Sequence, residues 1–199
     1  MKAIVFIDVQ KDFINGALRN EKAIEVTPKI VDFAKNIVTG VGDDIKLYAT
    51  LDTHKETEYV LKCDTLEPIT TIPPVRGYLT TLEGKKLPVE HCIEGSKGWE
   101  MNDDLWSVIG GKCTVVTKPT FGSFDLAEII FEDFENKKLD EIILVGFCTS
   151  ICVAANATIL RAKFPNTKIT VMKDLCACVT DESHNAALKV LEMQQIEIV

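Results

Sequence analysis

Short apolar segments alternate along this chain with longer segments in which apolar residues recur every three or four positions. A continuous apolar or β-branched run is typical of a strand buried on both faces of a parallel sheet, and the longer period is typical of a helix. The pattern predicts strands at residues 2–7, 46–51, 112–117, 141–146, 168–172 and 196–199. It predicts helices at residues 26–38, 125–136, 151–163 and 182–193, with Pro28 near the first turn of its helix, where proline is tolerated.

This alternation predicts a single α/β domain over residues 1–199, built on an open, mostly parallel six-stranded sheet with helices on both faces. Residues 55–106 interrupt the alternation, because they contain four prolines and no long periodic stretch. Irregular segments of this length are usually lids or binding loops. We therefore expect an insertion at about 55–106 that contributes to a metal or substrate site.

Composition and charge exclude several classes of protein. The 199 residues carry a formal net charge of −8 and no cluster of basic residues, which argues against nucleic acid as a partner. No apolar run approaches the roughly 18–20 residues of a membrane span. The seven cysteines are an odd number without the spacing of a disulfide framework, and no secretory leader opens the chain. We expect a cytoplasmic protein with free thiols.

Ionisable residues follow the predicted strands at the points where the strands end. Ligands of open parallel sheets bind beyond the carboxyl ends of the strands. Asp8 follows the first predicted strand, and Lys118 follows the third. A buried charge is costly unless it is paired, so we expect these two side chains to meet. The alternative for Asp8 is a helix cap.

Cys152 lies in the turn between the fourth predicted strand and the next helix. The positive end of a helix dipole would lower the pKa of its thiol, and backbone N–H groups in the turn could stabilise an oxyanion. The alternative is a small buried apolar residue. Cys148 precedes Cys152 by a spacing that differs from the usual two-residue redox or zinc motif. The other cysteines are interpreted as structural: Cys63, Cys92, Cys113, Cys176 and Cys178.

A carboxylate and two imidazoles form a candidate metal site. Asp52 and His54 follow the second predicted strand, and His91 lies farther along the chain. Such a group suits zinc, iron or manganese, although a carboxylate two residues before a histidine also occurs by chance. The third histidine, His184, lies on a predicted surface helix.

Together, five motifs resemble a known family. They are Asp8 with Gln10, Asp12 and Phe13; residues 52–54 (DTH); residues 91–98 (HCIEGSKG); Lys118 with residues 121–124 (FGSF); and residues 146–153 (GFCTSICV). Over nearly its whole length, the chain resembles the isochorismatase-like cysteine hydrolases, and within them the nicotinamidases.

The resemblance implies a six-stranded parallel sheet and a catalytic trio at Asp8, Lys118 and Cys152. It also implies a cis peptide bond between Phe147 and Cys148. The backbone N–H groups of Cys148 and Cys152 would then bind the oxyanion.

For the metal, the resemblance implies Asp52, His54 and His91 as ligands, with Glu83 as a further candidate. The ion would be divalent, zinc first, with iron or manganese as alternatives. Phe13 matches a position that packs against substrate, and homo-oligomers are usual in the family.

Two departures bear on the substrate. Leu87-Pro88 stands where nicotinamidases often have Trp-Pro, so Trp99 or Trp106 would have to supply a stacking ring. The segment at about 55–82 is also longer than in a minimal member.

The predicted function is hydrolysis of a small amide, such as nicotinamide or pyrazinamide, to an acid and ammonia through a thioester at Cys152. Other amide, carbamoyl or ureido compounds are alternatives. Isochorismatase activity is a further one, although members with that activity generally lack the nucleophilic cysteine. A binding or scaffold protein that retains the fold is the alternative outside enzymes.

Overall fold

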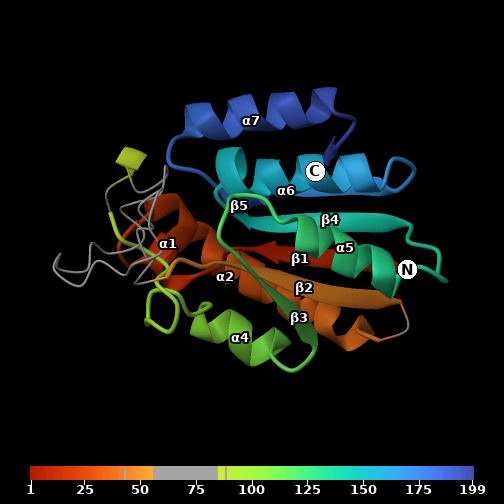
Figure 1. The fold of residues 1–199 in the computed structure, drawn as a ribbon, viewed down its shortest axis with the longest axis horizontal. Helices are drawn as coiled ribbons and strands as arrows, with labels where there is room; N and C mark the ends of the chain where they lie inside the picture. The colour runs from red at the N-terminus through yellow and green to blue at the C-terminus, as the bar shows by residue number, and fades with distance from the viewer. Residues whose placement is uncertain (43, 56–84, 88) are drawn as a thin grey trace, which may run out of the picture.

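A computed structural model describes residues 1–42, 44–55, 85–87 and 89–199 (Figure 1). Its centre is a six-stranded sheet with the order β3-β2-β1-β4-β5-β6, and every pair of neighbouring strands in it is parallel. The strands are β1 (Lys2–Ile7), β2 (Ile45–Asp52), β3 (Cys113–Lys118), β4 (Glu141–Phe147), β5 (Lys168–Ala177) and β6 (Glu197–Ile198). The predicted fold class is confirmed.

Helices cover both faces of the sheet (Figure 1). One face packs against α2 (Glu21–Ile37) and α4 (Asp103–Ile109). The other packs against α5 (Phe124–Asp133), α6 (Ala154–Lys163) and α7 (Asp181–Met193). Short helical segments complete the chain: α1 (Lys11–Ile14), η1 (Val38–Gly40) and η3 (Thr149–Val153). Among the described residues, no helix combines the length and apolar character that crossing a bilayer requires.

The central strand β1 shows why its sequence is continuously apolar. Val5 and Ile7 pack into the core beneath α5, α6 and α7, whereas Ile4 and Phe6 pack into the core against α2 and α4. Since successive side chains of a strand point to opposite faces, both sets must be apolar. The predicted range of this strand agrees with the structure.

Several predicted boundaries were wrong. Helix α2 begins at Glu21 rather than near Val26, because the side chain of Asn20 caps it by accepting hydrogen bonds from the N–H groups of Lys22 and Ala23. Pro28 therefore lies in the helix interior, on its exposed face, and not in the first turn. Proline has no N–H to donate to the backbone carbonyl one turn earlier in the helix. On the exposed face water can hydrate that carbonyl, which reduces the free-energy cost of the proline.

Other differences concern the segments around the site. β5 extends to Ala177, five residues beyond its predicted end. The predicted helix at 151–163 starts with the π-helical turn η3 before α6. The structure also adds α4, capped by Asn102, at the end of the stretch that we predicted to be irregular.

The order of the strands places a switch point between β1 and β4. The chain passes from β1 outward to β2 and β3, and then fills the other side with β4, β5 and β6. A crevice opens at the carboxyl ends of strands where the order reverses in this way. Gly146 lies beside this point with φ +125°, and a Cβ there would lie 2.1 Å from the carbonyl oxygen of Ile7. Only glycine fits this contact.

We expect Gly146→Ala to destabilise the fold by roughly 2–4 kcal/mol, because it adds a backbone clash to an unfavourable φ. Gly42→Ala is the matched control, since Gly42 has φ +134° and a Cβ added there would meet no described atom within 4 Å. Urea unfolding of the two variants measures the difference. Equal losses of free energy would contradict the role given to the contact with β1.

Candidate active site and metal centre

A buried ion pair lies at the carboxyl edge of the sheet. Lys118 is the last residue of β3 and Asp8 directly follows β1, so the lysine side chain reaches past the end of β2. Lys118 Nζ lies 2.7 Å from Asp8 Oδ2, and the two side chains are 1% and 0% exposed. The structure thus brings together the two charges that the sequence places at separate strand ends.

The thiol of Cys152 lies beside this pair. Cys152 belongs to η3, the turn that follows β4. Because β4 is the neighbour of β1, this turn lies on the opposite side of the switch point from β2 and β3. Lys118 Nζ donates to Cys152 Sγ over 3.6 Å. The peptide bond between Phe147 and Cys148 is cis, as predicted.

The expected lowering of the pKa of Cys152 was wrong. Burial raises the pKa of this thiol well above its ordinary value, and the negative charge of Asp8 adds to the effect, whereas Lys118 only partly opposes it. The backbone dipoles of the turn do not overcome the cost of desolvating a thiolate. The thiol of Cys152 is therefore neutral at rest, and forming its thiolate would require a base.

The charges of the cluster affect one another. Burial raises the pKa of Asp8 above its ordinary value of 3.8, with the charge of Lys118 opposing and that of Asp52 adding to the rise. Burial works against the charged form of Lys118, but Asp8, Cys152 and Asp52 outweigh it and raise the pKa of the lysine. Lys118 therefore stays protonated, and Asp8 is a carboxylate of increased basicity.

Thr50 is a further member of the cluster that sequence reasoning missed. It lies on β2 opposite Ile7, and its hydroxyl donates to Asp8 Oδ1 over 2.6 Å. The N–H of Asp8 donates back to Thr50 Oγ1 over 3.2 Å, and Asp8 has the unusual φ of +49°. A threonine near the end of a buried strand was the available signal, but its partner follows only from the strand order.

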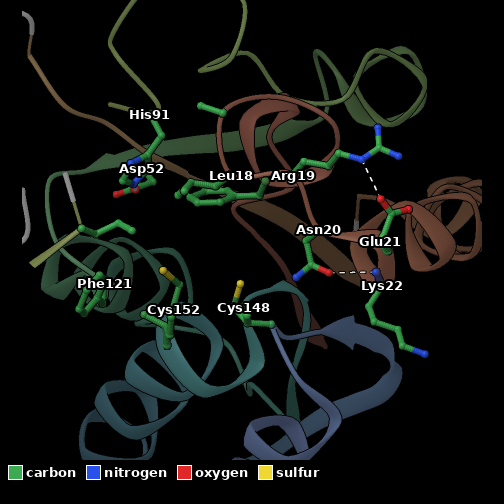
Figure 2. A pocket seen from close by; sticks show the side chains of 15 residues that line it. Leu18, Arg19, Asn20, Glu21, Lys22, Asp52, His91, Phe121, Cys148 and Cys152 are labelled. Atoms are coloured by element: carbon green, nitrogen blue, oxygen red, sulfur yellow. Dashed lines mark hydrogen bonds and ion pairs between the residues drawn. The ribbon is translucent and has the colours of Figure 1, made fainter. Parts of the chain in front are cut away.

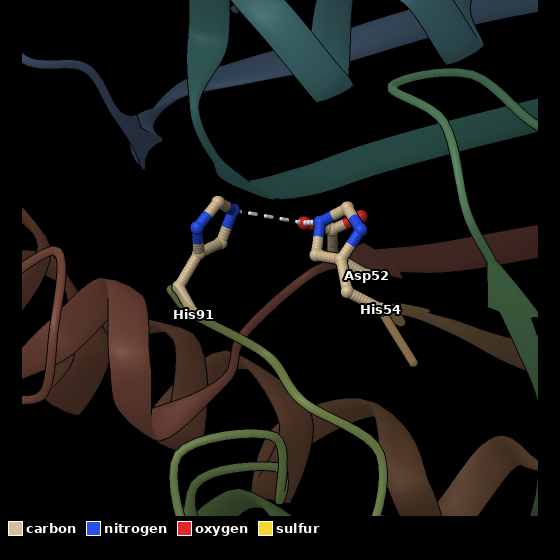
Figure 3. Close-up of side chains that lie close together, drawn as sticks. All are labelled: Asp52, His54 and His91. Carbon is tan, nitrogen blue, oxygen red and sulfur yellow. Dashed lines mark hydrogen bonds and ion pairs between the residues drawn. The ribbon is translucent and has the colours of Figure 1, made fainter. Parts of the chain in front are cut away.

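The candidate metal ligands also converge (Figure 3). Asp52, the last residue of β2, places Oδ2 at 3.2 Å from His54 Nε2 and 3.5 Å from His91 Nε2. All three side chains are buried, and their ligand atoms lie within 4.8 Å of one another. Atoms about 2.0–2.1 Å from a tetrahedral zinc ion lie roughly 3.3 Å apart, which matches the two measured separations.

Hydrogen bonding orients His91 for a metal. Its Nδ1 lies 2.8 Å from the carbonyl oxygen of Val89, and because a carbonyl only accepts, Nδ1 carries the proton. The lone pair of Nε2 then points toward Asp52, an arrangement common for ligating histidines. Burial disfavours the charge of Asp52. When the ring nitrogens that face it are protonated, hydrogen bonds from His54 and His91, together with the charge of Lys118, outweigh this and lower the pKa of the carboxyl.

These three residues therefore fit a divalent cation. Asp52 Oδ1 is buried and has no hydrogen-bond donor among the described residues. The fourth predicted ligand, Glu83, lies outside the described residues.

A cavity of about 790 Å³ opens over Cys152 and two of the three candidate metal ligands (Figure 2). Its lining includes Asp52 and His91 beside Cys148 and Cys152. The apolar part of the wall consists mainly of Phe13, Ala17, Leu18, Leu87, Phe121, Ile151 and Val179.

Phe13 lies in this cavity with its ring centroid 5.7 Å from that of His91. Neither tryptophan that we considered as a stacking ring lines the cavity. The indole N–H of Trp99 donates to Thr53 Oγ1 over 2.8 Å, and Trp106 is half-exposed on α4. Phe13, Phe121 and Leu87 supply the apolar surface instead.

Asn156 holds the turn that carries Cys152, and it too was missed. This fully buried side chain donates to the carbonyl oxygens of Cys152 over 2.8 Å and Phe121 over 3.0 Å. Its Oδ1 accepts from the N–H of Ser123 over 3.0 Å. An asparagine four residues after the nucleophile candidate, on the same helical face, was the signal in the sequence.

The fold and the site define an α/β protein of the doubly wound type, with an acid, an amine and a thiol joined at the switch point of a parallel sheet. The family model described as "Isochorismatase domain" matches residues 2–199. The chain belongs to the isochorismatase family of hydrolases.

Solved structures share the fold over the whole chain at low sequence identity. A nicotinamidase/pyrazinamidase from Bacillus subtilis superimposes with a TM-score of 0.74 at 23% identity, covering 100% of this chain and 98% of that one. A pyrazinamidase from Pyrococcus horikoshii in complex with zinc gives 0.72 at 19% identity, with coverage of 100% and 98%. A pyrazinamidase/nicotinamidase from Streptococcus mutans gives 0.69 at 22%, with both chains covered to 100%.

We expect Thr50→Val to raise the pKa of Asp8 further, because it removes a hydrogen bond to the ionised carboxylate. Carbon-13 NMR of the labelled Asp8 carboxyl measures the titration directly, and in the unaltered protein it should lie above 3.8. The control is Thr170→Val, which removes a buried hydroxyl that donates to Glu141 over 2.7 Å. An Asp8 titration that is the same in both variants would contradict the assignment.

Proposed function

We propose that this protein is a cysteine amidohydrolase that converts a small aromatic amide, of the nicotinamide or pyrazinamide kind, into an acid and ammonia. The observation that carries the proposal is the contact of Cys152 with the Asp8–Lys118 pair at the floor of a mainly apolar cavity. The likeness to nicotinamidases and pyrazinamidases from three organisms supports the substrate class.

In the first step Asp8 acts as the base. Its carboxylate accepts the proton of the Cys152 thiol, and the sulfur attacks the amide carbonyl carbon to form a tetrahedral intermediate. Lys118 stabilises the ionised groups during this transfer, since it lies 2.7 Å from the carboxylate and 3.6 Å from the sulfur. We assign the oxyanion to the backbone N–H groups of Cys148 and Cys152.

In the following steps the proton on Asp8 passes to the departing nitrogen. The C–N bond breaks, ammonia leaves, and a thioester remains on Cys152. Water then attacks the thioester while Asp8 accepts one of its protons. The C–S bond breaks, the acid is released, and the proton returns to the sulfur.

Asp52, His54 and His91 would hold a divalent metal, with zinc first because of the ligand set and the spacing of the ligand atoms. When bound, the ion would supply a Lewis acid that orients a ring nitrogen of the substrate or a water molecule. Phe13 beside His91 would pack against the ring of a substrate held there.

One observation favours a larger substrate as the second candidate. The cavity of about 790 Å³ is in the upper part of the range of roughly 300–1,000 Å³ that drug-sized ligands occupy. A single-ring amide would leave much of this space unused. A bulkier amide or ureido compound would pass through the same chemistry at Cys152.

We expect Cys152→Ala to reduce ammonia release by at least about 10⁴-fold without unfolding the protein, because the covalent step is lost. A panel of nicotinamide, pyrazinamide and larger amides or ureido compounds identifies the substrate class. Cys176→Ala, which removes another buried thiol, is the control and should keep its activity. Undiminished turnover by Cys152→Ala would contradict the covalent mechanism, and a wild-type protein silent on the whole panel would favour the binding protein.

We expect the purified protein to carry about one divalent ion per chain, and His54→Ala or His91→Ala to lose most of it, because removing a ligand typically weakens binding severely. Elemental analysis after dialysis measures the content without reference to activity. His184→Ala is the matched control, since His184 bonds to Thr149 and lies outside the site. Equal metal content in all three variants would contradict the assigned ligands.

A further inference from the structure

Two cysteines outside the proposed catalytic trio lie beyond the ends of neighbouring strands. Cys148 directly follows β4, and Cys178 directly follows β5. In the parallel pairing of these strands Gly146 lies opposite Cys176 and Phe147 lies opposite Ala177. Cys148 and Cys178 are the residues that directly follow this last pair.

Their position after the last paired residues of neighbouring strands favours a separation that a disulfide can span. Neighbouring strands lie about 4.7–4.9 Å apart, and disulfides join residues whose Cα atoms are about 4.4–6.8 Å apart. Ser150, two residues after Cys148, places its Oγ 3.0 Å from Cys178 Sγ, so the sulfur of Cys178 faces the turn that carries Cys148. Each of the two thiols is the largest influence on the pKa of the other.

The surroundings of Cys178 stabilise a thiolate. Ser183 Oγ donates to Cys178 Sγ over 3.2 Å, and Ser150 Oγ lies 3.0 Å from the same sulfur. Hydrogen bonding from Cys148 and from these serines lowers the pKa of Cys178 to about 4, whereas the hydrogen bond to Cys178 and burial raise the pKa of Cys148. The two serine hydroxyls therefore favour the charged form of Cys178, which is the form that attacks a peroxide.

A small oxidant can approach this pair through the cavity over the active site. Cys148 is half-buried and lines the cavity (Figure 2). Cys178 itself is buried, but Val179, the next residue, also lines the cavity and is exposed. The pair therefore lies just behind the wall of a space open to small molecules.

We propose that Cys148 and Cys178 form a peroxide-sensitive dithiol site that closes reversibly to a disulfide beside the active site. Its reactant is hydrogen peroxide or a small organic hydroperoxide. Transient disulfides of this kind are compatible with a reducing compartment. The proposal does not depend on the proposed amide hydrolysis.

The chemistry proceeds in two displacements. The Cys178 thiolate attacks one peroxide oxygen, so that an S–O bond forms, the O–O bond breaks, and the leaving hydroxide takes up a proton to become water. The Cys148 sulfur then attacks the sulfenic sulfur, its proton goes to the departing oxygen, and a second water leaves as the S–S bond forms. The two thiols lose two electrons in total, and the peroxide gains them.

The test uses the reduced full-length protein treated with a small excess of hydrogen peroxide. Under denaturing conditions the thiol count should fall from the seven cysteines of the chain by two, and the intact mass should fall by about 2 Da. After alkylation and tryptic digestion, residues 139–161 should be cross-linked to residues 174–189, with fragmentation placing the bond at Cys148 and Cys178. Dithiothreitol should restore both thiols.

Each of the two peptides contains a second cysteine, so control variants are needed to show which sulfur atoms form the disulfide. Cys176→Ala and Cys152→Ala should still form the cross-link, whereas Cys148→Ala and Cys178→Ala should lose it. A protein that keeps all its thiols, a bond that involves Cys152 or Cys176 instead, or oxidation confined to Cys152 would each overturn the proposal. The peptide map of the unaltered protein decides the matter even if a variant fails to fold.

Discussion

The ion pair between Lys118 and Asp8 is the interaction on which the site depends. Neither charge is exposed to water, so each is tolerable only because the other lies 2.7 Å away. Removing one partner of such a pair costs about 3–5 kcal/mol, since it leaves an uncompensated buried charge. The pair spans the end of β2, and Asp52 Oδ1 lies 3.6 Å from the same ammonium. The catalytic candidates and the candidate metal ligands therefore share one charge network.

The fold was largely predictable because most of its strands are buried on both faces. The run at residues 2–7 must be apolar throughout to contact two cores, and its limits were therefore correct. Boundaries set by single side chains were not predictable in this way. The cap at Asn20 lengthens α2, and the extension of β5 to Ala177 depends on its pairing with β4. The start of α2 and the end of β5 thus depend on individual contacts, which the periodicity of apolar residues does not reveal.

The same distinction applies to the site. Asp8, Lys118 and Asp52 could be selected because ionisable residues at strand ends share one edge of a parallel sheet. Thr50 and Asn156 could not be placed, since their roles depend on which strands are neighbours and on where a side chain points. The pKa of Cys152 was expected to be lowered, but burial and Asp8 raise it. Cys178 was interpreted as structural or incidental, because Cys176 and Cys178 have one residue between them near a strand end and would point to opposite sides as poor joint ligands.

The pH dependence of Cys152 alkylation tests the charge network most directly, and it requires no substrate. Iodoacetamide labelling of Cys152, quantified by mass spectrometry of the peptide spanning residues 139–161, is compared between the unaltered protein and a folded Asp8→Asn variant. Because the charge of Asp8 adds to burial in raising the pKa of the thiol, labelling in the variant should begin at a lower pH. An unchanged profile, or one displaced to higher pH, would contradict the account.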